Sequence, residues 1–137
     1  TSSLPLQPYT AFPVQHGYQH LVSSRAAATS DSWDAMFAQA QDGVRLHFLG
    51  ERDTTVVLGE GLGQDLTVPV PFAMARRTGP MTRFIAVIEP YREKSRLRGV
   101  RRLRAEIVEI STEAGVDQVV LTPGHFHFTR LPPFSAP

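Results

Sequence analysis

Short apolar runs separated by turn residues fill most of this sequence, and their spacing is the feature that most limits its fold. Turn signals recur about every ten residues, as is typical of β-sandwiches and β-barrels. In the run VRLHFL, apolar and polar side chains alternate, as they do along a half-buried strand. Val44, Leu46 and Phe48 share one face, and Arg45 and His47 point to the other. The pattern predicts an all-β fold, an antiparallel two-sheet β-sandwich.

The segment from residue 30 to residue 41 has two interpretations. Its alanines favour a helix, but Trp33, Ala35 and Phe37 fit a two-residue period at least as well, so we predict a strand. The Asp-Gly pair at 42–43 follows, and both residue types tolerate the positive φ of a two-residue hairpin turn. We therefore expect a β-hairpin with residues 42–43 at its tip.

The sequence predicts an edge position in a sheet for one of the later strands and a central position for another. The expected strand at residues 66–70 contains Pro69 and is followed by Pro71. Proline in a strand indicates a sheet edge. The run FIAVIEP at 84–90 is apolar on both faces, which is typical of a central strand. The remaining expected strands lie at residues 18–25, 54–58, 72–77, 100–103, 105–110, 117–121 and 125–129.

Length and composition bound the organisation of the chain. Its 137 residues suit one domain, and proline-rich ends divide it into an extended arm or linker (1–15), a sandwich (16–130) and a proline-rich tail (131–137). The absence of Cys excludes disulfides, thiolate metal sites and a Cys nucleophile. No run approaches 18 apolar residues, so we expect no membrane span. The net charge of +1 predicts no partner by itself.

Residues 91–104 form the main charge anomaly, with seven of the fourteen basic residues and a single acid, Glu93. Guanidinium groups bind anions in a bidentate manner, so this run is a candidate site for an acidic polysaccharide. The alternative is a charged edge strand that blocks pairing between sheets. The run has no interleaved aromatics, so we expect no nucleic-acid binding. The candidate glycan-binding residues here are Arg92, Arg96, Arg98, Arg101 and Arg102.

Two groups of histidines are further candidates. On a strand, His16, Tyr18 and His20 would share one face, where a tyrosine ring can stack on a sugar and imidazoles can hydrogen-bond its hydroxyls. The alternative is a partly buried tyrosine between solvated histidines. His125 and His127 also share a strand face and are weak zinc candidates, since no acid lies at a tight spacing. We expect no other cofactor, and no residue pattern predicts a catalytic site.

Five segments, in order, resemble the C-terminal region of heparinase II/III-family polysaccharide lyases. They are HGYQHL (16–21), SWDAMF (32–37), GVRLHFLGE (43–51), PFAMARRTG (71–79) and FIAVIEPYR (84–92). The resemblance implies a larger secreted or periplasmic enzyme with an α/α toroid followed by β-sandwich layers. Such enzymes cleave uronate-containing polysaccharides, glycosaminoglycans among them, by β-elimination. In that family the toroid and the first β segment supply the catalytic groups, so no catalytic residue transfers to this chain.

Three functional hypotheses follow. The first is a non-catalytic accessory domain that supports the toroid of such a lyase and contacts the acidic glycan. It predicts an apolar surface left exposed where the toroid would pack. The second is an autonomous carbohydrate-binding module for acidic polysaccharides, whose binding would weaken with salt. The third is a small lyase in its own right. The expected partners are the toroid and an acidic polysaccharide, with neither nucleic acid nor membrane.

Overall fold

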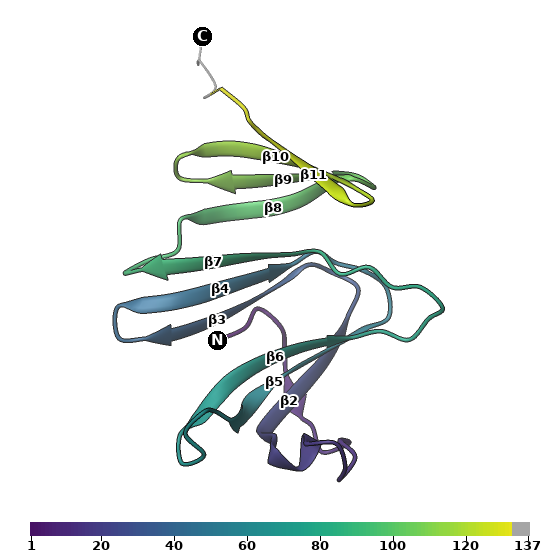
Figure 1. Cartoon of the computed structure of the whole chain (residues 1–137), viewed down its shortest axis with the longest axis vertical. Coiled ribbons are helices and arrows are strands. Elements are labelled where there is room, and N and C mark those ends of the chain that lie inside the picture. Colours follow the sequence, from purple (N-terminus) through teal and green to yellow (C-terminus); the bar gives the residue numbers. More distant parts are fainter. Residues whose placement is uncertain (133–137) are drawn as a thin grey trace.

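The computed structural model describes residues 1–132, and these form three antiparallel sheets (Figure 1). Sheet A has the strand order β3-β4-β7, sheet B the order β1-β2-β5-β6, and sheet C the order β11-β10-β9-β8. The strands are β1 (Gln7–Pro8), β2 (Val22–Thr29), β3 (Trp33–Gln39), β4 (Asp42–Phe48), β5 (Thr54–Leu62), β6 (Pro69–Arg76), β7 (Ala86–Arg92), β8 (Leu97–Arg104), β9 (Ile107–Thr112), β10 (Gly115–Thr122) and β11 (His125–Arg130).

Sheets A and B pack face to face around one apolar core. Trp33 and Ala35 of β3 and Val56 of β5 are buried at its centre. The Trp33 ring lies parallel to the ring of Phe48, with centroids 4.5 Å apart. Leu46 packs on the same cluster from β4. The expected all-β sandwich is therefore confirmed, and residues 30–41 contain a strand, as predicted.

The N-terminal arm is extended and docked on both sheets of the sandwich. β1 pairs with β2, and the amino group of Thr1 donates to the carbonyl of Met36 over 2.8 Å. Leu4 packs against the apolar core. Arg25 donates to the carbonyl of Leu6 over 2.8 Å. These contacts make the first residues part of the sandwich.

The β3–β4 hairpin turns two residues earlier than predicted. Gln39 pairs with Asp42, so Ala40 and Gln41 form the tip, and Ala40 takes the positive φ of 54°. Gly43 lies inside β4, where a Cβ atom would overlap the Tyr91 ring of β7. Glycine at this position therefore lets the Tyr91 ring pack closely against β4. The prediction of a turn at residues 42–43 is wrong.

The predicted central strand is also wrong. β7 begins at Ala86 and forms an edge of sheet A, where Ile88 is 65% exposed. β6 does form an edge of sheet B, as its prolines predicted, although it begins only at Pro69 and residues 66–68 form a turn before it.

The sequence pattern predicts the strands of sheet C as part of the sandwich, but they form a sheet of their own. Its four strands follow one another as antiparallel neighbours, and no described residue pairs them with a strand of sheet A or B. In Figure 1, sheet C lies beyond β7, at the opposite end of the long axis from sheet B. β8 and β11 are its two edge strands, and all six residues of β11 are exposed. The described part of the tail, residues 131–132, follows β11, and the remainder of the predicted tail lies outside the described residues.

Candidate functional site

The proposed stripe of His16, Tyr18 and His20 does not form on a strand. His16 and Gly17 have left-handed φ angles of 61° and 89°, and they lead into a short 3₁₀ helix, η1 (Tyr18–His20). Tyr18 turns inward and stacks on the ring of Phe12, with centroids 5.1 Å apart. His16 and His20 stay exposed. The three side chains therefore do not share one strand face, because two left-handed residues break the extended backbone before β2 begins.

Most basic residues of the Arg-rich run are paired with carboxylates. Arg101 lies 2.6 Å from Glu109, and Arg102 lies 3.2 Å from Glu51. The other pairs are Arg92 with Asp42, and both Lys94 and Arg98 with Glu113. Within residues 1–132, only Arg96 and Arg104 of this run make no such pair. The run itself contains a single acid, because the carboxylates that pair with its basic residues lie on other strands or loops.

These pairs hold the carboxylates in their charged form. A hydrogen bond from Lys94 lowers the pKa of Glu113, with added attraction from Arg98. A hydrogen bond from Arg101 likewise lowers the pKa of Glu109. At neutral pH much of the positive charge of the run is therefore balanced locally. An acidic glycan would have to displace these carboxylates or bind through Arg96 and Arg104.

His125 and His127 occupy β11 on one face, as the two-residue period predicted. They pair with Thr122 and Val120 of β10 and are exposed. Among residues 1–132, no group of three His, Asp or Glu side chains lies close enough together to hold a metal ion. The two histidines thus have no third ligand within the described part of the chain.

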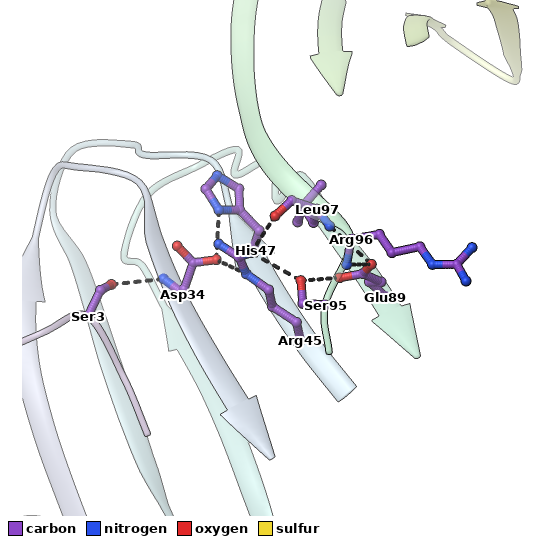
Figure 2. A network of polar contacts seen from close by, with 8 residues as sticks. All are labelled: Ser3, Asp34, Arg45, His47, Glu89, Ser95, Arg96 and Leu97. Carbon is purple, nitrogen blue, oxygen red and sulfur yellow. Dashed lines mark hydrogen bonds and ion pairs between the residues drawn. The ribbon is translucent and has the colours of Figure 1, made fainter. Parts of the chain in front are cut away.

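A polar network that the sequence did not predict joins sheet A to the start of sheet C (Figure 2). Arg45 of β4 is its centre. Its Nε donates to Asp34 Oδ1 over 2.8 Å, and its Nη1 donates to the carbonyl of Leu97 over 2.7 Å and to Ser95 Oγ over 3.2 Å. One guanidinium therefore links two strands of sheet A to the first residue of β8.

Glu89 of β7 forms the other half of the network. One carboxylate oxygen accepts hydrogen bonds from the backbone N–H groups of Arg96 and Leu97, at 2.7 and 3.1 Å. The other accepts the hydroxyl of Ser95 at 2.6 Å. Glu89 and Arg45 together thus hold the turn from β7 into β8, from which sheet C begins (Figure 2).

His47 completes the network from inside. Its Nδ1 lies 3.0 Å from Asp34 Oδ1, and the ionised carboxylate can only accept, so Nδ1–H donates. His47 is only 8% exposed, and its Nε2 has no partner among the described residues. Burial alone would raise the pKa of Asp34, but the hydrogen bonds from Arg45 and His47 outweigh it and lower the pKa.

An Asp–His pair can serve acid–base chemistry, but only where a substrate reaches the free ring nitrogen. Here Nε2 is buried. The arrangement therefore suits a structural link better than a reaction. Its residues come from three of the segments quoted above: Asp34 from SWDAMF, Arg45 and His47 from GVRLHFLGE, and Glu89 from FIAVIEPYR. The available signal was that Asp34, Arg45 and His47 lie opposite the apolar face of their strands, whereas Glu89 stands in a run that is apolar on both faces.

Comparison of the chain with protein-family models, curated proteins and solved structures finds no match. Among residues 1–132, no helix has the length and apolar character needed to cross a membrane.

Proposed function

We propose that this chain is a non-catalytic β-sandwich domain that packs against the catalytic toroid of a heparinase II/III-like lyase. The motif segments that suggested this family supply the Trp33 core and the Asp34–Arg45–Glu89 network. Both are structural features. Such a domain would support the catalytic part and leave the β-elimination to it.

The surface area of the chain carries the proposal. The folded chain exposes 9839 Å². A compact monomer of 15.2 kDa exposes about 7,100 Å². The five residues outside the described part would add at most about 800 Å², which leaves an excess of about 1,900 Å². Each partner in a standard interface buries about 800 Å², so the excess is large enough for a permanent contact.

Exposed apolar side chains indicate where that contact can form. Leu62, Leu66, Val68 and Val70 are 43–71% exposed around the turn between β5 and β6. Large apolar side chains gathered at one place on a surface are typical of an interaction site. Packing of this turn against a toroid would remove them from water.

A role in holding the acidic glycan belongs to the same proposal. Arg96 and Arg104 are the side chains of the Arg-rich run that keep their charge without a carboxylate partner in residues 1–132. They can supply a weak, salt-sensitive contact that adds to binding by the catalytic part.

The decisive experiment compares this chain with the natural protein that carries it. Each is incubated with heparin, alginate or ulvan, and the ultraviolet absorbance of the unsaturated uronate product is followed. We expect a rise with the natural protein and a flat trace with residues 1–137 alone. The sequence preceding Thr1 in the natural protein should encode a helical toroid.

Either of two results would overturn the proposal. A rise in absorbance with the isolated chain would make it an enzyme. If the natural sequence before Thr1 encodes no helical toroid, the proposed domain has no catalytic partner to pack against. Weak retention of the isolated chain on a heparin column at low salt fits the proposal, whereas retention that persists at physiological salt would make the autonomous binding module the better description.

A further inference from the structure

A hollow of about 400 Å³ lies where the N-terminal arm crosses the start of β2. The arm supplies Tyr9 and Phe12, η1 supplies Tyr18, and the first residues of β2 supply Ser23 and Ser24. Its volume falls within the range typical of small-ligand sites. None of the polar contacts described above uses it.

The aromatic rings of this hollow form a fixed platform. Phe12 and Tyr18 stack with an angle of 11° between their planes, and Tyr9 meets Phe12 edge-on at 84° with centroids 4.8 Å apart. Arg76 of β6 donates to the Tyr9 hydroxyl over 3.2 Å, which leaves the hydroxyl hydrogen of Tyr9 free to donate. The rings are therefore positioned before any ligand arrives.

The floor of the hollow is irregular where a regular strand would be expected. The pairing of β2 with β5 shifts between Val22 and Arg25, and Ser23 there has a left-handed φ of 52°. The Ser24 hydroxyl is buried without a hydrogen-bond partner among the described residues. A bulge and a left-handed residue each have a cost, and both are common beside ligand sites. The Ser24 hydroxyl is shielded from solvent, so it is not among the atoms that a ligand would touch.

The types of side chain that line the hollow indicate the class of ligand that it would bind. No lining side chain is charged: the walls are aromatic rings, prolines, aliphatic residues, hydroxyls and the Gln19 amide. A sugar ring matches this set, because its C–H face stacks on an aromatic ring and its hydroxyls pair with neutral donors and acceptors. We propose that this hollow binds a neutral pyranose unit of a glycan.

An acidic sugar and a proline-rich peptide fit the site less well. A uronate carboxylate would find no cation in the lining. Proline-rich peptides dock in grooves between aromatic side chains, and the stacked rings of Phe12 and Tyr18 leave no slot between them. The inference does not depend on the lyase proposal, because it concerns another surface and an uncharged ligand.

Nuclear magnetic resonance titration of the whole chain tests the inference. The probes are neutral hexasaccharides of glucose, galactose and mannose, a heparin hexasaccharide and a proline-rich peptide. We expect at least one neutral hexasaccharide to shift the amide resonances of Tyr9, Ser23 and Ser24, with an affinity that does not change with salt.

Two variants and one control separate binding from folding. Tyr9→Phe should weaken binding about 10-fold while leaving the unfolding midpoint nearly unchanged, because it keeps the ring and removes the hydroxyl that is free to donate to the sugar. Tyr18→Ala should abolish binding. His20→Ala lies in the same 3₁₀ turn but does not line the hollow, and it should bind as the unaltered chain does.

Several outcomes would overturn the inference. They are the absence of shifts with every neutral hexasaccharide, binding of only heparin or the peptide at these residues, and full affinity in Tyr9→Phe. The last comparison still decides the matter if Tyr18→Ala does not fold.

Discussion

The sandwich of sheets A and B and the outlying sheet C are stabilised in different ways. In the sandwich, Trp33, Ala35 and Val56 are buried between two facing sheets. In sheet C, charged pairs such as Arg101–Glu109 and Arg130–Asp117 join neighbouring strands, and most of its side chains touch water. Apolar burial is insensitive to pH and salt, whereas ion pairs respond to both. The two regions should therefore fail under different conditions.

Removing the centre of the sandwich gives the largest expected effect. Trp33→Ala should lower the free energy of unfolding by about 3–5 kcal/mol, because it leaves a cavity beside Phe48. Urea titration followed by far-ultraviolet circular dichroism measures the change. Phe128→Ala removes an exposed ring of sheet C and should change the value by less than about 0.5 kcal/mol. Equal losses in both variants would contradict the contrast between the two regions.

The link between the regions comes next. Arg45→Met keeps most of the side-chain volume but removes the guanidinium donor from the Leu97 carbonyl and from Asp34, which keeps only the hydrogen bond from His47, and it should cost about 2 kcal/mol. Hydrogen exchange should quicken in β8 while Val57 in β5 stays protected. The matched control is Arg92→Met, whose pair with Asp42 is exposed and should contribute little. Uniform loss of protection would show that sheet C is not separately anchored.

Acid should loosen sheet C before the sandwich. The pKa values of Glu109, Glu113 and Asp117 in sheet C and its β9–β10 turn lie below their usual range, as does that of Asp34, the sheet A carboxylate that accepts from the anchoring Arg45. A group whose pKa is lower in the folded state stabilises the fold above its unfolded pKa of about 4, and this contribution is lost as pH falls through the folded value. Exchange measured at decreasing pH below about 4 should therefore show β8 and β10 opening first. Simultaneous opening of β5 would contradict this order.

The smallest effect concerns charge alone. Glu113→Gln releases Lys94 and Arg98 from their carboxylate, so the chain should elute from heparin at a higher salt concentration. Glu60→Gln makes the same change of net charge at an exposed residue without an ion pair in residues 1–132. Its elution should shift less. Equal shifts in the two variants would show that only net charge matters and that the pairing is irrelevant to glycan contact.

Local patterns predicted some parts of this structure well. The alternation of Val44, Leu46 and Phe48 gave the strand and its buried face, and the prolines of β6 gave an edge. Both signals act within one strand, so they can be read without knowing its neighbours.

Other features depend on which strands become neighbours. The partners of the arginines, such as Glu51 and Glu109, come within reach only once strands are paired and sheets are placed. The role of Gly43 depends on Tyr91, which lies far away in sequence. The network around Arg45 required knowing that the turn from β7 into β8 lies beside Arg45 and Glu89. The left-handed pair at His16 and Gly17 gave no periodic signal at all.

The position of the β3–β4 hairpin has a consequence for how the chain finds its register. Val44 and Leu46 face the core of the sandwich, whereas Arg45 and His47 point to the opposite face, from which Arg45 reaches Ser95 and Leu97. Because side chains alternate with a period of two, a slip of one residue would exchange every one of them. Arg45 and His47 would then enter an apolar core without partners, and sheet C would lose its anchor in the same step. A slip of one residue is thus unfavourable on both faces of β4, so this hairpin favours the correct register of strand pairing.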